Sequence, residues 1–356
     1  MRKESLEFLK RLLTTPSPSG YEAANQKIWC DYARQFADEV RTDAYGNGVA
    51  ILNPAGDPKV MFDGHVDELG LMVKHIDSNG FIFFQRIGGV DVATVRGKRV
   101  SIHTADGIVR GVVGNTAIHL QDKDKEAKVP KWHEVFIDIG AKDAEECKTR
   151  VAVGDPITFV DDFEMITEHV AVARAFDNRA GAWVAIEALR MVAQGKGKPK
   201  CAIYATSSVQ EEVGLAGAQM NVGAVQPDCA IAIDVTHATD TPGIDVKQHG
   251  EVKMGKGPTL SIGRENHPVI VQKLRKIAKQ EKIDYQVETF SLTGGTDAFA
   301  FYTKNGGTPS AIVSIPNRYM HSTVEMLDLR DLEDTAKLLA AFAIDIKKGD
   351  RFKVKV

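Results

Sequence analysis

The spacing of hydrophobic and polar residues changes along the chain, and each change indicates a different kind of structure. The leucines near the N-terminus recur at helical spacing, and a second helical pattern covers residues 21–40. Two short apolar runs follow at residues 49–52 and 60–62, and the turn sequence GNG precedes the first run. The N-terminal part of the chain therefore predicts two helices followed by two strands.

The pattern between residues 70 and 162 consists of short apolar runs at short intervals. Turn-forming pairs separate these runs, among them Asn79-Gly80, Gly88-Gly89 and Asp106-Gly107. Several short strands with turns at this spacing are typical of a small antiparallel barrel. We therefore expect a β-barrel over residues 70–162.

Strand and helix patterns alternate from residue 163 to the C-terminus. Such alternation on both sides of an all-β stretch predicts an α/β domain that is interrupted by an inserted barrel. Residues 1–69 and 163–356 would form the α/β domain, and residues 70–162 would form the insertion. The main patterns of the last part are helices at 178–193 and 267–282 and strands at 201–205, 230–235 and 311–315.

Composition excludes several classes of protein. A formal charge of −3 and a sequence pI of about 6.4 give no reason to expect nucleic acid or an anionic membrane as partner. No apolar run approaches the length that spans a bilayer, and the N-terminus lacks the apolar core of a signal peptide. The 4 cysteines lie far apart and form no C-x-x-C pair, so we expect reduced thiols in a cytoplasmic protein.

Imidazole and carboxylate side chains follow the predicted strands at the point where each strand ends. Ligands of open α/β sheets bind at the carboxyl ends of the strands, so we expect these side chains to meet. One further carboxylate lies in ARAFDNRAG, just before the helix at residue 178. The set comprises His65, Asp67, Asp177, Glu211, Glu212, Asp234 and His321.

Taken singly, most of these residues have an ordinary structural explanation. His65 fits a hydrogen-bonded polar residue at a strand end, Asp177 fits a helix N-cap, and His321 fits a turn. Asp67 changes the interpretation of His65, because a metal-bound histidine usually has a carboxylate that fixes its orientation. Asp234 closes the apolar run CAIAID and needs a partner there.

Taken together, two histidines and several carboxylates form a mixed nitrogen and oxygen donor set that suits zinc, cobalt or manganese. The set is large enough for two ions, with one bridging carboxylate and one carboxylate left to act as general base. Other nucleophiles fit less well, since the chain has no G-x-S-x-G motif and no cysteine in an activating context. The glycine-rich stretches SLTGGTDAFAF and QRIGGVDV lack the residues of a phosphate-binding loop.

The stretches FDGHVDELGLMV, ARAFDNRAG, QEEVGLAGA, IAIDVT, LTGGTDAFAF and IPNRYMHSTVE, in this order, carry a resemblance that runs almost end to end. The chain resembles the glutamyl-aminopeptidase-type, tetrahedral (TET) aminopeptidases, dinuclear metallopeptidases of clan MH. The resemblance implies a three-layer α/β/α catalytic domain of the zinc-exopeptidase type with a mixed sheet. It also implies that the inserted barrel serves in dimerisation and assembly, in a homo-oligomer that would be a dodecamer.

The same resemblance implies a role for each residue of the set. His65 and Asp234 would each complete the shell of one metal, Asp177 would bridge both ions, and Glu212 with His321 would hold the second ion. Asp67 would support His65. Glu211 would be the general base that takes a proton from a metal-bound water. The implied reaction removes N-terminal residues from short peptides with a free N-terminus, with two divalent ions per subunit, zinc before cobalt or manganese.

Two alternatives stay open at this point. A dinuclear amidohydrolase or deacylase that acts on N-acyl amino acids would use the same chemistry on another substrate. A non-catalytic scaffold would use the metals for stability alone, although such a protein has no use for an unligated Glu211. The loop Thr293–Asp297 is most simply a tight turn into a helix, and a second hypothesis places it at the pocket for the first side chain of the substrate.

Overall fold

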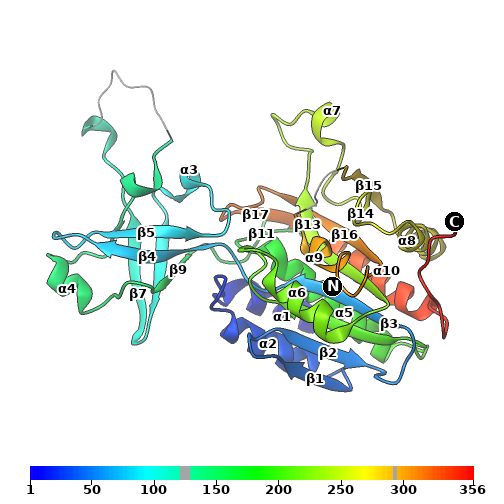
Figure 1. The fold of residues 1–356 in the computed structure, drawn as a ribbon. Helices are drawn as coiled ribbons and strands as arrows, with labels where there is room; N and C mark the ends of the chain where they lie inside the picture. The colour runs from blue at the N-terminus through cyan, green and yellow to red at the C-terminus, as the bar shows by residue number, and fades with distance from the viewer. Residues whose placement is uncertain (121–128, 292–294) are drawn as a thin grey trace.

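Two sheets, one open and one closed into a barrel, organise the chain (Figure 1). The computed structural model describes residues 1–120, 129–291 and 295–356. The open sheet lies in the α/β domain, which also holds both termini, and the barrel projects to one side of it. This arrangement confirms the fold class expected from the sequence, a mixed α/β protein with an inserted barrel.

The open sheet has parallel strands at its centre and antiparallel strands on its flanks. The four central strands run parallel in the order β12, β3, β13 and β16, so their carboxyl ends meet at one edge. Beside them, β14 (Thr259–Ile262) pairs with β16 and with β15 (Gln286–Thr289). The main path is β1 (Glu39–Thr42), β2 (Gly48–Leu52), β12 (Ala202–Ser208), β3 (Lys59–His65), β13 (Cys229–His237), β16 (Ser310–Arg318), β17 (Glu325–Asp328), β11 (Val170–Ala173) and β10 (Glu164–Met165).

Helices cover both faces of this sheet. Successive side chains of the central strands point to opposite faces, so Phe62 packs with one helical layer and its neighbour Met61 with the other. Because both faces are covered, β12 and β13 are buried at nearly every position rather than at every second one. One layer contains α1 (Lys3–Thr14), α2 (Ala23–Ala33), α5 (Phe176–Gln194), α8 (Pro268–Glu281) and α10 (Leu329–Asp345), and the other contains α6 (Ala216–Val225) and α9 (Asp297–Phe301).

The barrel closes through six antiparallel strands and has a hydrophobic core of its own, with Leu71, Ile102 and Ile157 fully buried at its centre. Short helices α3 (Val92–Val95) and α4 (Ala144–Lys148) lie on it, and α7 (Val246–His249) belongs to the α/β domain. No helix among the described residues is long and apolar enough to cross a membrane. The barrel strands are β4 (Gly70–Ile76), β5 (Ile82–Ile87), β8 (Ile137–Asp138), β7 (Gly107–Val113), β6 (Arg99–Thr104) and β9 (Pro156–Phe159).

The prediction of one helix over residues 21–40 is wrong for its second half. The helix ends at Ala33, and Glu39 already begins β1, which pairs with β2 as an antiparallel hairpin. The backbone amide of Asp38 donates a hydrogen bond to the carbonyl of Ile51, so this segment already pairs with the sheet. Within the loop Thr293–Asp297, Thr293 and Gly294 lie outside the described residues. The division of the chain at residues 69/70 and 162/163 stays a prediction.

Candidate metal centre

The seven side chains singled out from the sequence lie together at the carboxyl edge of the parallel strands. His65 is the last residue of β3, and Asp234 lies near the end of β13. The glutamate pair follows β12, His321 follows β16, and Asp177 lies in the first turn of α5. The edge of the sheet thus brings together residues that are separated by up to 256 positions in the chain.

Asp177 lies between the two histidines. Its Oδ1 is 3.2 Å from Nε2 of His65, and its Oδ2 is 3.3 Å from Nε2 of His321. Burial opposes ionisation of this carboxyl, but the hydrogen bonds from His321 and His65 hold its pKa well below the usual range. A carboxylate that directs one oxygen to each of two imidazoles has the placement expected of a bridging ligand.

The adjacent glutamates face different histidines. Glu211 Oε2 lies 3.6 Å from Nε2 of His65, and Glu212 Oε2 lies 3.7 Å from Nε2 of His321. Ligand atoms of His65, Asp177 and Glu212 lie within 4.8 Å of one another, and so do those of His65, Glu211 and Asp234. Two overlapping groups therefore have the spacing of metal ligands.

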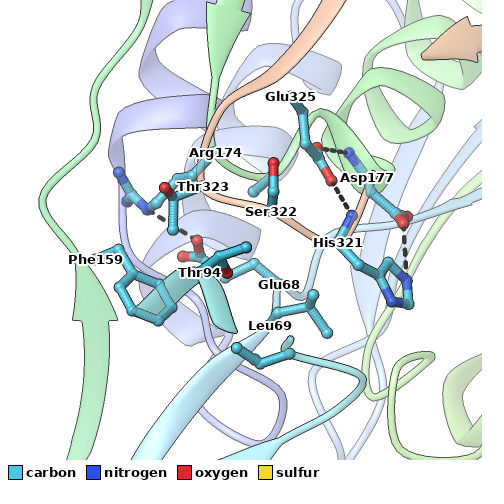
Figure 2. Close-up of a pocket in the computed structure, with 12 residues that line it drawn as sticks. Glu68, Leu69, Thr94, Phe159, Arg174, Asp177, His321, Ser322, Thr323 and Glu325 are labelled. Atoms are coloured by element: carbon cyan, nitrogen blue, oxygen red, sulfur yellow. Dashed lines mark hydrogen bonds and ion pairs between the residues drawn. The ribbon is translucent and has the colours of Figure 1, made fainter. Parts of the chain in front are cut away.

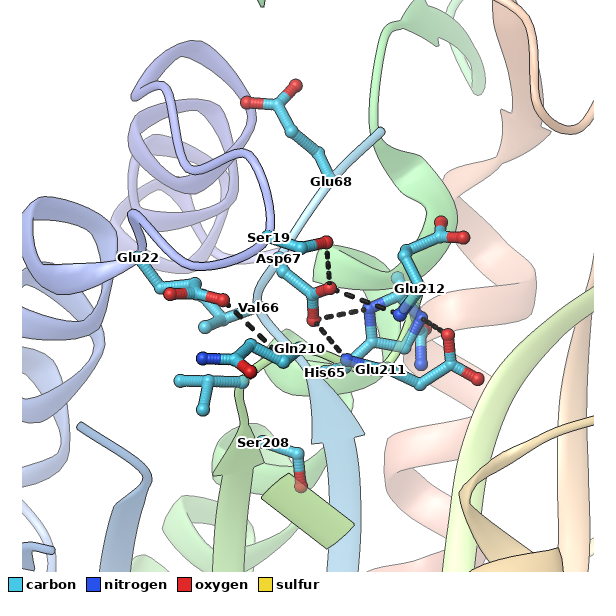
Figure 3. Close-up of polar contacts among 12 residues, drawn as sticks. Ser19, Glu22, His65, Val66, Asp67, Glu68, Ser208, Gln210, Glu211 and Glu212 are labelled. Carbon is cyan, nitrogen blue, oxygen red and sulfur yellow. Dashed lines mark hydrogen bonds and ion pairs between the residues drawn. The ribbon is translucent and has the colours of Figure 1, made fainter. Parts of the chain in front are cut away.

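Asp67 connects the glutamate pair to His65 (Figure 3). It accepts hydrogen bonds from the backbone amides of Glu211 at 3.0 Å and Glu212 at 3.2 Å, and from Oγ of Ser19 at 2.6 Å. Its Oδ1 also lies 3.3 Å from Nδ1 of His65. One buried carboxylate thus fixes the His65 ring, directs its Nε2 toward the centre, and holds the backbone of both glutamates.

The buried carboxyl groups of this cluster would be stabilised in their charged form by a bound cation. Burial raises the pKa of Glu211 and of Glu212 well above the usual range, and it raises the pKa of Asp234 to about 7. Oε1 of Glu212 is buried and finds no hydrogen-bond partner among the described residues. The centre thus holds two imidazoles and the carboxyl groups of Asp177, Glu211, Glu212 and Asp234, one of which has an unpartnered buried oxygen. Such a donor set fits divalent metal ions.

Glu325, which the sequence did not single out, holds two of these residues in place (Figure 2). Its Oε2 accepts a hydrogen bond from the backbone amide of Asp177 at 2.8 Å, and its Oε1 accepts one from the amide of His321 at 3.0 Å. His321 has a left-handed backbone, with φ of 62°, which a non-glycine residue adopts only when its surroundings hold it. Only its position in the motif IPNRYMHSTVE points to Glu325, because its partners are backbone groups.

Glu22 supports the glutamate pair from the other side and was also missed. Its Oε1 accepts hydrogen bonds from the backbone amides of Gly20 at 2.7 Å and Gln210 at 3.1 Å. Gln210, with φ of 55°, is another left-handed residue, and it directly precedes Glu211. The turn that presents the two glutamates is therefore held by buried carboxylates on both sides.

A small pocket lies beside the cluster, at the junction with the barrel (Figure 2). Asp177 and His321 line it from the α/β domain, and Val90, Thr94 and Phe159 line it from the barrel. Asp297, from the loop whose role was left open, is buried deeper in the α/β domain and interacts with Asp63 of β3. The hypothesis that this loop lines a substrate pocket stays a prediction.

Comparison with known proteins agrees with this geometry. Residues 46–338 match the model of the M42 glutamyl aminopeptidase family. The chain belongs to this family. The resemblance inferred from the sequence is thereby confirmed, and membership makes the chain a peptidase.

Individual members of the family are similar over nearly their whole length. The lysyl aminopeptidase of Pyrococcus furiosus is 35% identical over 350 residues, which cover 97% of this chain and 98% of the relative. A TET aminopeptidase from a marine sediment archaeon of the Thaumarchaeota has a TM-score of 0.91 and 35% identity, with 96% of both chains covered. The TET1 peptidase of Pyrococcus horikoshii, which can assemble into a tetrahedron or a large octahedral shell, has a TM-score of 0.85 and 31% identity, with 96% of this chain and 100% of that chain covered.

Proposed function

We propose that this chain is a metal-dependent aminopeptidase that removes N-terminal residues from short peptides. The observation that carries the proposal is the position of Asp177, one oxygen toward each histidine, among buried carboxylates that need a cation. His65, Asp177, Glu212, Asp234 and His321 would hold two divalent ions. Zinc fits these nitrogen and oxygen donors best, and cobalt and manganese also suit them.

The chain's own residues divide the remaining work. Bound divalent ions would supply Lewis acidity, which polarises a carbonyl and makes water a better nucleophile. Glu211 would accept a proton from the attacking water and donate it to the leaving amine. Burial favours this role, since it raises the pKa of Glu211 toward the range in which a carboxylate takes up and releases a proton. Asp67 would keep Glu211 and His65 in their mutual orientation.

The substitution Glu211→Gln tests the proposed division of roles. The variant keeps the backbone bond to Asp67 and the shape of the side chain, so we expect both ions to stay bound. Turnover of aminoacyl substrates should fall by roughly 10²–10⁴-fold, because the proton acceptor is lost. Metal content and turnover are measured on the same sample. Wild-type turnover in the variant would show that Glu211 is not the base.

The alternative of a deacylase is tested with paired substrates. An aminopeptidase should cleave a peptide with a free amino terminus and reject the same peptide when it is N-acetylated, whereas the deacylase should instead release acetate from an N-acetyl amino acid. Relatives known as lysyl and glutamyl aminopeptidases favour the first outcome. If wild-type protein with bound metal cleaved neither peptide nor the N-acetyl amino acid, the scaffold alternative would gain support.

We also propose that the chain assembles with copies of itself. Related TET peptidases of known structure form a dodecamer, a tetrahedron or an octahedral shell. The barrel presents exposed apolar side chains, Ile108 and Val112, that a second copy would cover. Light scattering of the purified protein gives the oligomeric mass. The four cysteines are buried and free, which suits the cytoplasm as the proposed location.

A further inference from the structure

The Gly88-Gly89 pair of the barrel lies against the metal centre. It follows β5, and Gly88 has a left-handed backbone with φ of 72°. A Cβ atom on Gly88 would lie 2.5 Å from Cδ2 of Leu69 and 3.2 Å from Cβ of Glu212. A Cβ atom on Gly89 would lie 2.7 Å from Nδ1 of His321. The turn therefore approaches Glu212 and His321 as closely as glycine allows.

The backbone of this turn also hydrogen-bonds the His321 ring. The Nδ1 edge of the ring faces Gly89, and Nε2 faces Asp177 at 3.3 Å. Gly89 offers the ring a backbone hydrogen-bond partner on this edge, and because a ring N–H can only donate, that partner is the Gly89 carbonyl. A metal-binding histidine usually donates its second ring N–H to such a partner, which sets its orientation.

The two histidines are thus oriented by different parts of the chain. The His65 ring is buried, and a carboxylate of its own domain, Asp67, holds it. The His321 side chain is 40% exposed, so packing restrains it less, and its Nδ1 edge meets the barrel. Val90 and Thr94, which follow the glycine pair, line the same pocket as His321.

We infer that the Gly88-Gly89 turn positions Glu212 and His321, so that the docked barrel sets the affinity of the ion these two residues hold. This inference rests on the proposed function, because it presupposes two bound ions. The ion that His65 and Asp234 serve would depend on the α/β domain alone. The barrel would then be part of the metal centre, in addition to its proposed part in assembly.

The test is Gly89→Ala, with metal binding to the metal-free protein measured by calorimetric titration. An added methyl group displaces the His321 ring from the Gly89 carbonyl, so one of the two zinc sites should weaken by roughly 10–100-fold. The other site should keep its affinity. Gly97→Ala is the control in the barrel, since Gly97 has no atom within 4 Å of the added Cβ. Unlike Gly89, Gly97 has a left-handed backbone, φ of 76°, so its substitution strains the barrel without touching the centre. We expect it to bind both ions as wild type does.

A double substitution separates positioning from general damage to the barrel. In a His321→Ala background, Gly89→Ala should cause no further loss of zinc affinity, because its effect acts through the ring. Equal losses with and without His321, or wild-type affinities in Gly89→Ala, would overturn the inference. A wild-type protein that binds fewer than two ions would instead overturn the proposed function.

Discussion

At the scale of single residues, the centre depends on buried carboxylates that touch no proposed metal. Asp67, Glu22 and Glu325 each accept hydrogen bonds from backbone amides of the segments that form the site. A backbone amide that donates to a buried acceptor has a fixed main-chain conformation. Two of the residues held in this way, Gln210 and His321, have a left-handed backbone. The orientation of the proposed ligands is therefore set by main-chain hydrogen bonds as much as by side-chain packing.

Glu22 gives this arrangement a pH dependence. Burial raises its pKa from 4.5 to about 7, so in the folded protein it stays protonated over a range in which the unfolded chain has lost the proton. Its contribution to stability should therefore decline as the pH rises from about 4.5 to about 7 and then level off. At about 1.4 kcal/mol per pKa unit, the total is on the order of 3–4 kcal/mol.

The variant Glu22→Gln removes this ionisation and keeps an acceptor for the two amides. Its thermal midpoint relative to wild type should rise between pH 5 and pH 8. Glu39→Gln, at an exposed position of β1, is the control and should show no such change. A difference between Glu22→Gln and wild type that stays constant over this range would show that Glu22 does not titrate there.

At the scale of elements, the distance between α5 and the sheet decides where Asp177 lies. Gly64 of β3 faces Gly181 of α5, and a Cβ on Gly64 would lie 2.3 Å from the backbone of Gly181. A Cβ on Gly181 would in turn lie 2.3 Å from the carbonyl oxygen of Ile233 in β13. Side chains at these positions would push the helix outward, together with Asp177 at its start. The two glycines thus let a helix-borne carboxylate reach His65 at the adjacent strand end.

Gly64→Ala should therefore disturb both stability and metal binding. We expect a loss of about 1–3 kcal/mol from overpacking, and weaker binding of both ions because Asp177 would bridge them. Chemical denaturation and zinc titration measure the two effects. Gly223→Ala in α6, where an added Cβ meets no atom within 4 Å, should leave zinc binding unchanged. Normal zinc affinity in Gly64→Ala would show that the helix position does not control the site.

At the scale of the whole molecule, the sequence predicted what depends on local pattern and failed where distant contacts decide. Alternating elements and turn pairs indicated the α/β domain and the barrel, and strand ends indicated the seven clustered residues. The segment after Ala33 fits a helix by its local pattern, but the pairing of β1 with β2 makes its end a strand. Glu325 was missed because it accepts hydrogen bonds from backbone amides, one of them 148 positions away, and backbone groups leave no pattern in the sequence. The contact of Gly89 with His321 lies between the barrel and the end of β16 in the open sheet, and no local pattern encodes it.

The whole fold should also depend on the proposed ions. Without them the centre holds Glu211, Glu212 and Asp234 buried together, and burial makes their charged forms unfavourable. Ions that bind only the folded protein stabilise it by about 2.7 kcal/mol per site at a concentration 100 times Kd. For two sites this stabilisation corresponds to a thermal midpoint higher by roughly 5–10 °C.

Removal of metal with a chelator should therefore lower the midpoint by this amount, and added zinc should restore it. The control is Asp177→Ala, which lacks the bridging carboxylate and should show little response to chelator or zinc. The comparison isolates the metal centre, because any effect of the chelator elsewhere would act on both proteins alike. Equal midpoints of wild-type protein with and without metal, once metal analysis has shown that the ions have left, would mean that the buried carboxylates are stabilised by their hydrogen bonds alone.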